Sequence, residues 1–476
     1  MRPPQDDRGA KLVYNIHMRN AILISAGKSV SGISRLLNKG NGSTWPGHIA
    51  LNVNKNFIKD ILRKNPQLKI ILIAGTNGKT TTAKLITSIL ENNGNRVFQN
   101  KAGANLLNGI ASSLLLHSSI LCAIPYDYAV FEVDENSLPL VLKELSPDYL
   151  ILLNLFRDQL DRYGEVNTIA DKWQKAIEQL SNKTIVILNA DDPQIAFLGT
   201  NLSSRAHSIN LVRGDLPEKK IAASLTAPRN DNTFYFGLDD KKLHQNVLQH
   251  AVDSTYCPNC KNKLTYKTVY FSHLGDWKCS KCGFARGPLD GKDSPYYPLP
   301  GVYNQYNTNA AVLFAKLSNI SNETIKQSLK KFSPAFGRQE IIHVDGKKVQ
   351  LFLSKNPTSF NQSLRTIKDL GATEILLVLN DHIPDGRDVS WIWDVDFENY
   401  LNNSSMTITI SGDRCYDLGL RLRYTSTEAD FRIEEDLKIA VIMALQGTYK
   451  TETLYILPTY SAMLEARKIL TGKKIL

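Results

Sequence analysis

The sequence lacks the long apolar runs that membrane-spanning helices need. A spanning helix takes about 18 or more consecutive apolar residues, whereas the longest runs here, such as residues 375–379, are only as long as a core strand. Residues 1–7 are polar and contain proline, and the apolar run at 21–25 is too short and too late for a secretory signal. The sequence therefore predicts a cytoplasmic protein that does not cross a membrane.

Extended disorder is also excluded, because the composition is that of a globular protein. Hydrophobic residues make up 42% and charged residues 22%, both close to average usage. With 476 residues, the chain is too long for one ordinary core, so we expect two or three domains. The formal net charge of +11 suits nucleic acid, an anionic lipid surface or a phosphorylated substrate, and charge alone does not choose among them.

Alternating strands and helices occupy the first half of the chain. Residues 69–74 predict a buried strand that leads through a glycine turn into a helix over 80–91. Further apolar runs are separated by helical patterns such as 169–180, and this alternation predicts a parallel sheet with helices on both faces. These further strands are expected at 128–133, 149–154 and 184–189.

The pattern changes twice after this region. Residues 211–292 are polar, rich in Tyr and Lys, and surround four cysteines, which indicates an inserted module. A second α/β region begins near Gly337, with strands expected at 348–353, 374–379, 406–410 and 453–457 and a helix at 434–445. We therefore divide the chain into an N-terminal segment (1–44), a central domain (45–325) whose insertion covers about 250–290, and a smaller Rossmann-like C-terminal α/β domain (335–476). Residues 11–37 are open to two interpretations, a basic amphipathic helix with Lys28 and Arg35 on its polar face or a plain packed helix.

Four of the six cysteines predict a zinc ribbon. They form two Cys-x-x-Cys pairs that are separated by eighteen residues, which is the spacing of a closed tetrahedral four-thiolate zinc site. Such a site stabilises a small module that has little apolar core. Two disulfides in place of the zinc site are disfavoured, because a phosphate-binding enzyme is expected in the reducing cytosol. The predicted ligands are Cys257, Cys260, Cys279 and Cys282.

A glycine loop between the first strand and its helix predicts a phosphate site. Glycines let the backbone close around phosphate oxygens, helix N–H groups point at them, a lysine adds positive charge, and a threonine hydroxyl can bind Mg²⁺. The usual pattern has one more glycine five residues before Gly78, where Ile73 stands, so this is not the loop of motor proteins or GTPases. The predicted ATP and Mg²⁺ residues of the loop are Gly75, Thr76, Asn77, Gly78, Lys79, Thr80 and Thr81.

This shorter Gly-Thr-Asn-Gly-Lys-Thr loop resembles that of the Mur ligases and folylpolyglutamate synthases. Four later segments resemble the same family in the same order, at 129–134, 154–164, 188–193 and 300–307. The resemblance implies that Glu132 ligates Mg²⁺ and that Asn304 and Asn307 face the adenine of ATP. Three family histidines are replaced, by Gln159, Tyr163 and Tyr303.

Combined with the zinc ribbon, residues 380–394 and 457–464 resemble the MurT branch of this family over nearly the whole chain. The resemblance implies ATP-dependent amidation of the α-carboxyl of D-glutamate in the lipid II stem peptide, through an acyl phosphate, during cell-wall synthesis. Lys79 and Glu132 are then catalytic. Peripheral contact with the inner face of the membrane is a further expectation, which goes with the basic amphipathic-helix interpretation of residues 11–37.

Ammonia must come from elsewhere, because neither non-zinc cysteine, Cys122 or Cys415, lies in a nucleophile elbow. By resemblance, the partner is a GatD-type glutaminase whose Cys and His are completed by a carboxylate of this chain, with Asp388 as the first choice and Asp385 as the second.

Two other functions stay open at this point. A Mur-type amino-acid ligase is disfavoured because the family's Asp-x-x-x-His-Asn-Pro segment survives only as residues 353–357, without its acid or histidine. An ATPase whose zinc ribbon grips nucleic acid is favoured by the basic balance, yet no basic-aromatic RNA signature occurs.

Overall fold

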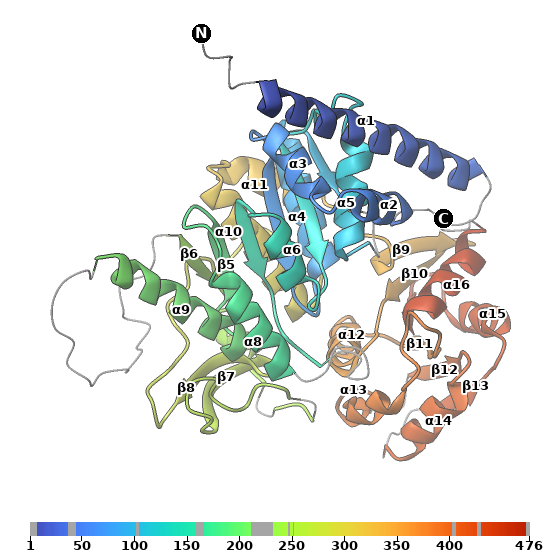
Figure 1. Cartoon of the computed structure of the whole chain (residues 1–476). Coiled ribbons are helices and arrows are strands. Elements are labelled where there is room, and N and C mark those ends of the chain that lie inside the picture. The colour runs from blue at the N-terminus through green and yellow to red at the C-terminus, as the bar shows by residue number, and fades with distance from the viewer. Residues whose placement is uncertain are drawn as a thin grey trace, which may run out of the picture.

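The computed structural model contains two six-stranded sheets, each covered by helices, and a separate two-stranded hairpin (Figure 1). It describes residues 7–36, 44–100, 104–157, 166–210, 232–245, 248–250, 252–401, 406–425 and 430–472.

The central sheet is parallel throughout, with strand order β2-β3-β1-β4-β5-β6. Its inner strands are buried along almost their whole length, as expected for a sheet that is covered on both faces. This confirms the predicted α/β architecture, with strand boundaries within two residues of the expected ones. The strands are β1 (Lys69–Ala74), β2 (Val97–Gln99), β3 (Tyr128–Val133), β4 (Tyr149–Leu152), β5 (Ile185–Asn189) and β6 (Thr233–Phe236).

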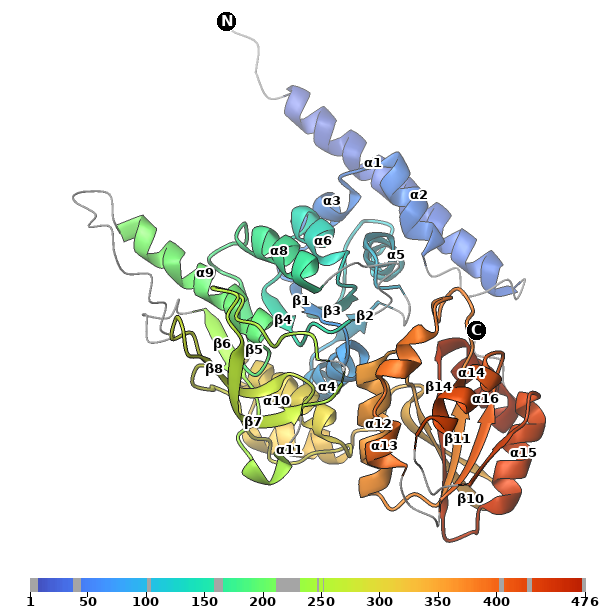
Figure 2. The same ribbon diagram turned by 90° about the horizontal axis from the view of Figure 1, so that it is seen from below.

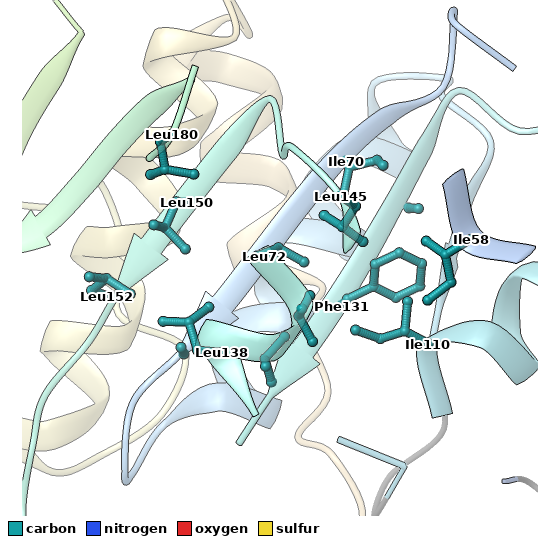
Figure 3. Close-up of a cluster of buried hydrophobic side chains, with 14 of the residues drawn as sticks. Ile58, Ile70, Leu72, Ile110, Phe131, Leu138, Leu145, Leu150, Leu152 and Leu180 are labelled. Carbon is teal, nitrogen blue, oxygen red and sulfur yellow. The ribbon is translucent and has the colours of Figure 1, made fainter. Parts of the chain in front are cut away.

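Alternate residues of these strands enter two different cores. Leu72, Phe131 and Leu150 point to the face that is covered by helices including α5 (Leu107–His117), α6 (Leu138–Glu144) and α8 (Val166–Ile177), as Figure 3 shows. Ile71, Ile73 and Val130 point to the other face. There they pack against α4 (Lys79–Asn92), α10 (Val302–Leu317) and α11 (Asn322–Lys330).

Three N-terminal helices form an outer layer over α5: α1 (Asp7–Leu36), α2 (Trp45–Val53) and α3 (Phe57–Lys64). Leu23 and Ile24 of α1 and Ala50 of α2 are buried in the same core as the sheet. One face of the described part of α1 is therefore packed. Across the described residues, no helix is long and apolar enough to cross a membrane.

After α9 (Pro193–Asn210) the chain adds β6 to the central sheet, so the predicted change of pattern at 211 comes before the inserted module begins. The module follows β6 and is built on the antiparallel hairpin of β7 (Leu264–Phe271) and β8 (Leu274–Cys279). Its small core contains Trp277 and Phe284 beside two of the cysteines. Trp277 donates from Nε1 to the carbonyl of Ala190 over 3.1 Å, which attaches the module to the end of β5.

The second sheet has order β13-β12-β11-β14-β10-β9 and is parallel except for the edge strand β9, which pairs antiparallel with β10. Its strands are β9 (Arg338–Val344), β10 (Lys347–Phe352), β11 (Glu374–Val378), β12 (Thr407–Ser411), β13 (Asp430–Ile433) and β14 (Thr453–Pro458). One face carries α12 (Pro357–Asp369), α13 (Phe397–Tyr400) and α14 (Cys415–Arg423). The other carries α15 (Leu437–Gly447) and α16 (Tyr460–Thr471).

The two domains meet along α12, as the view in Figure 2 shows. Arg365 of α12 donates to the carbonyl of Tyr270 in the inserted module over 2.6 Å. The Nδ1 of His250 lies 2.5 Å from Asp396 Oδ1. The second domain therefore closes against the carboxyl ends of the central strands, where the glycine loop lies.

Candidate nucleotide and zinc sites

The glycine loop leaves the N-terminus of α4 open. Gly75 and Gly78 have φ of +148° and +93°, and Gly78 is the N-cap of α4, so none of the described side chains caps that helix. The free N–H groups of a helix N-terminus and its positive dipole end attract anions. The local backbone therefore has the form of a phosphate site.

Neighbouring atoms require glycine at both positions. A Cβ on Gly78 would lie 2.1 Å from Asn307 Oδ1, and one on Gly75 would lie 2.9 Å from Leu153 Cβ. Both positions also have positive φ, which L-residues with side chains avoid. Close packing by α10 and β4 thus fixes the shape of the loop.

Asn154, at the end of β4, holds the loop from the other side. Its carbonyl accepts from Thr76 N at 3.0 Å, and its side chain accepts from Asn77 N at 2.9 Å and donates to Asn77 O at 3.0 Å. Three hydrogen bonds to consecutive residues leave the loop little conformational freedom. This preorganises the backbone for a ligand.

Lys79 lies at the centre of the loop and is buried. Its Nζ donates to Gly75 O at 2.5 Å and lies 3.3 Å from Glu135 Oε2 and 3.6 Å from Asp134 Oδ1. Two carboxylates and a carbonyl around one ammonium hold it beside the open helix end. The lysine is thus placed to meet the phosphates of a nucleotide.

Thr80, next to Lys79 in α4, contacts Glu132 of β3. Thr80 Oγ1 donates to Glu132 Oε2 over 2.7 Å. Burial raises the pKa of Glu132, whereas the Thr80 hydrogen bond and the nearby Arg338 and Lys79 lower it. A threonine hydroxyl beside a buried carboxylate offers the hard oxygen ligands that Mg²⁺ prefers, so these two residues fit a magnesium ion.

A pocket beside the loop is lined by both domains. Asn77, Gly78, Asn304 and Asn307 line it from the central domain. Arg338, Gln339, Phe352 and Gln362 are among the residues that line it from the second domain. The predicted Asn304 and Asn307 therefore lie together at this pocket, where Asn307 Nδ2 donates to Asn304 Oδ1 over 3.2 Å.

Several amide groups of this pocket lack a partner within the described chain. They are the Nδ2 of Asn77, the Oε1 of Gln339 and both polar atoms of the Gln362 side chain. Buried amides are expensive to leave unpaired. These unpaired amides fit a planar polar ligand with donors and acceptors, such as a nucleotide base.

Tyr303 stands where the family has histidine, and it contacts the second domain. Its hydroxyl accepts a hydrogen bond of 2.5 Å from Gln339 Nε2, and burial raises its pKa to about 12. Gln339 has a positive φ of 62°. The replacements Gln159 and Tyr163 lie outside the described residues, which stop at 157 and resume at 166.

The two aspartates expected at the glutaminase interface differ in their surroundings. Asp385 is buried, and its Oδ1 accepts from Ser461 N at 2.8 Å, which ties the loop after β11 to the start of α16. Asp388 is exposed, and its Oδ1 accepts from Ser390 N at 2.8 Å. That hydrogen bond lowers the pKa of Asp388, so its carboxylate is ionised and accessible.

The four predicted metal ligands come together in the module. The sulfur atoms of Cys257, Cys260, Cys279 and Cys282 all lie within 4.8 Å of one another. The distance is 3.6 Å for Cys257–Cys282 and 3.4 Å for Cys260–Cys279, close to the ~3.8 Å between thiolates that bind tetrahedral zinc at ~2.3 Å. Lys261 and Gly283 both have positive φ, each four residues after the first cysteine of its pair. The two turns thus share one shape and aim both pairs at one point.

Sequence reasoning missed three kinds of site residue. Asp134 and Glu135 follow the expected Glu132 directly, and the rule that working groups gather at the ends of parallel strands could have included them. Arg338 and Gln339 sit at the start of the second domain. Gln362 lies within α12, where no motif marks it, so only the domain contact reveals its role.

Comparison with known proteins agrees with this geometry. The Mur ligase middle domain matches residues 73–248, and the MurT ligase C-terminal domain matches residues 353–463. A pseudomurein peptide ligase type C from Methanothermus fervidus shares the fold, with a TM-score of 0.60 over 87% of this chain and 81% of that one at 22% identity.

Curated relatives match over nearly the full length. The lipid II isoglutaminyl synthase (glutamine-hydrolyzing) subunit MurT of Staphylococcus aureus (strain COL) is 32% identical over 468 residues, or 94% of this chain and 96% of the relative. The subunit of the same name from Streptococcus pneumoniae (strain ATCC BAA-255 / R6) is 31% identical over 97% of this chain and 99% of the relative. With this identity over this length, the chain belongs to the MurT family of Mur-type ligases.

Proposed function

We propose that this chain is the ATP-dependent synthetase subunit that converts the D-glutamate of the lipid II stem peptide to D-isoglutamine. The names of its relatives support this function. The single observation that carries it is the glycine loop, whose open helix end faces Lys79 and a pocket with unpaired amides.

The chemistry requires activation of a carboxylate. A carboxylate resists attack because its leaving group would be oxide. Transfer of the terminal phosphoryl group of ATP gives an acyl phosphate, ammonia then attacks the acyl carbon, and phosphate leaves. The protein's task is to position the groups and neutralise charge. Lys79 and the N–H groups of α4 are suited to the phosphates, and Asn304 and Asn307 to the adenine.

Thr80 and Glu132 are the residues that we propose as Mg²⁺ ligands. When bound, the ion neutralises charge on the phosphates. Glu132 must be ionised to bind it; burial raises the pKa of Glu132, and the hydrogen bond from Thr80 and the charges of Arg338 and Lys79 oppose that rise. For the four cysteines we propose zinc in a structural role, because all four tetrahedral positions are protein ligands.

Ammonia is scarce at neutral pH, so we propose that a GatD-type glutaminase supplies it. Asp388 is our choice for the carboxylate that completes the partner's Cys-His pair, since its carboxylate is exposed. Such a group orients the histidine and stabilises its charged form. Because lipid II is anchored in a bilayer, we also propose that the subunit works at the cytoplasmic face of the membrane.

The direct test uses the chain purified together with its glutaminase. Mass spectrometry of lipid II after incubation with ATP and glutamine should show one hydroxyl replaced by an amino group. Lys79→Ala should abolish the product, by at least ~1000-fold as for other preorganised charge contacts. Lys348→Ala, on the second sheet, is the control and should remain active. An active Lys79→Ala enzyme contradicts the proposal.

A second test separates the two half-reactions. Asp388→Asn should lose glutamine-dependent product and keep activity with ammonium salts, because the synthetase site is untouched. Asp385→Asn should instead lower stability, since Asp385 holds the start of α16. Loss of both activities in a folded Asp388→Asn protein would remove that residue from the glutaminase site.

The same preparation discriminates the other candidate functions. A Mur-type amino-acid ligase would extend the peptide when amino acids replace glutamine. A nucleic-acid ATPase would hydrolyse ATP faster with DNA or RNA. Either outcome in place of amidation would overturn the proposed function.

A further inference from the structure

The positive charge of the chain is concentrated at its beginning. Residues 1–69 contain twelve Lys or Arg, three Asp and no Glu. The other 407 residues contain 45 basic and 43 acidic residues, so they are nearly neutral. The excess charge therefore belongs to the first 69 residues, most of which form α1, α2 and α3.

Apolar side chains are exposed on the same layer. Trp45, Ile49 and Val53 follow one another at intervals of four along α2, and Met18 and Ile22 do so along α1. Residues four apart lie on one face of a helix. Trp45 is 65% exposed and Ile22 is 62% exposed, so these side chains are displayed rather than packed.

The opposite faces of these helices are fixed to the domain. A Cβ on Gly27 would lie 2.7 Å from Leu115 Cδ2, and one on Gly47 would lie 2.0 Å from Asn108 O, so α1 and α2 both press on α5. Asn54 Nδ2 donates to Asn20 Oδ1 over 2.9 Å and joins the two helices. They lie side by side at the edge of the molecule in both views (Figures 1 and 2).

A neighbouring loop extends the apolar surface. Lys28 Nζ donates to Ser118 O over 2.6 Å, which holds the loop after α5 beside α1. In that loop Ile120 is 59% exposed and Leu121 is 76% exposed. We call the exposed apolar residues of α1, α2 and this loop the apolar edge; they are Met18, Ile22, Trp45, Ile49, Val53, Ile120 and Leu121.

Exposed acids are missing around the apolar edge. Among the described side chains of α1, α2 and α3, Asp60 is the one acid, and it is buried and bonded to Arg63 and Asn54. Arg19 and Lys55 are exposed, whereas the exposed Lys59 pairs with Glu144 of α6 over 3.4 Å. Basic residues beside exposed Trp and Ile are the features of a surface that lies on anionic lipid.

We propose that the apolar edge and its basic surroundings dock this subunit on an anionic bilayer. Apolar side chains enter the headgroup region, and Arg19 and Lys55 bind lipid phosphates. The inference deepens the proposed function and rests on it only for the location of the substrate. A neutral protein partner is disfavoured because it would leave this charge without a counterpart.

Vesicle co-sedimentation of the full complex with its glutaminase tests the docking surface. The probes are vesicles of phosphatidylglycerol in phosphatidylcholine and vesicles of phosphatidylcholine alone. The complex should bind the anionic vesicles and leave the neutral ones. The variant Ile22→Asn/Trp45→Gln, changed at exposed positions, should bind at least tenfold more weakly, and Arg19→Glu/Lys55→Glu should do the same.

The matched control is Ile439→Gln/Ile442→Gln, on the exposed face of α15, and it should bind as the wild type does. Equal binding by the Ile22/Trp45 variant, no binding by the wild type, a changed oligomeric state of the variant, or equally strong binding to RNA would each overturn the proposal. Amidation of detergent-solubilised lipid II tests the proposed function separately. If product forms but the vesicles are not bound, only the docking surface is wrong. If the vesicles are bound but no product forms, only the proposed function is wrong.

Discussion

The two sheets of this molecule have similar α/β architecture, but they differ in how the N-terminus of one helix that follows a strand is capped. After β1, α4 begins at Gly78 with no cap from the described side chains. After β10, α12 begins at Asn356, which accepts from Ser359 N at 2.8 Å while Ser359 Oγ accepts from Asn356 N at 3.1 Å. The second helix end satisfies itself through a capping box.

This difference is the reason that we place the proposed phosphate site on the first sheet and give the second sheet the role of a wall of that site. An open helix end attracts an anion, and a capped one does not need it. The two helix ends also face each other, since Asn356 Nδ2 lies 3.4 Å from Asn77 Oδ1. The capped domain therefore closes the site that the open one provides.

The largest effect is expected from a side chain added within the open glycine loop, which tests the difference between the two helix N-termini directly. Gly78→Ala should lower ATP-dependent amidation at least ~1000-fold, or about 4 kcal/mol of transition-state stabilisation, because its Cβ would meet Asn307 and its φ is positive. ATP binding measured by calorimetry should be lost as well.

Gly371→Ala is the matched control. Gly371 has φ +72°, and no described atom lies within 4 Å of its added Cβ. It should cost only the backbone strain of about 1–2 kcal/mol in unfolding free energy and keep ATP affinity. Equal loss of ATP affinity in both variants would show that backbone strain, and not the phosphate loop, governs binding.

A buried carboxylate gives the central domain a pH response. Asp191, just after β5, pairs with Arg286 at 2.6 Å and accepts from Tyr306 at 2.6 Å. Burial raises its pKa to about 6 although Arg286 lowers it. The folded state thus holds the proton more tightly than the unfolded state. The free energy of unfolding should fall, by up to about 3 kcal/mol, as pH rises from about 4 to about 6.

Urea unfolding at several pH values measures this response. Asp191→Asn should lack this part of the slope, so the difference between wild type and variant should level off above pH 6. Asp417, a half-buried aspartate whose pKa is lowered by its hydrogen bond with Arg414, is the control position. Asp417→Asn should keep the slope between pH 4 and 6. A rise of wild-type stability relative to Asp191→Asn over this range would reverse the assigned sign.

The smallest expected effect lies at the closed helix end. Asn356→Ala should lower the free energy of unfolding by about 1 kcal/mol, the usual value of an N-cap. Asp436→Ala, at the N-cap of α15, removes a similar bond to Ile439 N and should cost about the same. If Asn356→Ala weakens ATP binding and Asp436→Ala does not, the contact of Asn356 with Asn77 contributes to ATP binding in addition to the contribution of the cap to stability.

The sequence predicted what short-range patterns encode. Apolar runs at 69–74 and 128–133 became β1 and β3, since a strand buried on both faces needs them. The loop from Gly75 to Thr80 and the cysteine pairs were predictable because their chemistry depends on local spacing.

Long-range contacts were not predictable in the same way. Gln339 and Gln362 carry no motif, and they line the pocket because the second domain folds onto the first. The exposed face of α2 could not be predicted either, because Trp45, Ile49 and Val53 are residue types that usually lie in a core, and only the structure shows which side of the helix is packed.

Arg338 and Gln339 are the first residues of β9, and both line the pocket proposed for the nucleotide. Gln339 also hydrogen-bonds Tyr303 of the first domain. The connection between the domains is therefore itself a piece of the binding wall. Rotation of one domain against the other must move these pocket residues. The affinity of the proposed nucleotide site and the angle between the domains are therefore thermodynamically coupled.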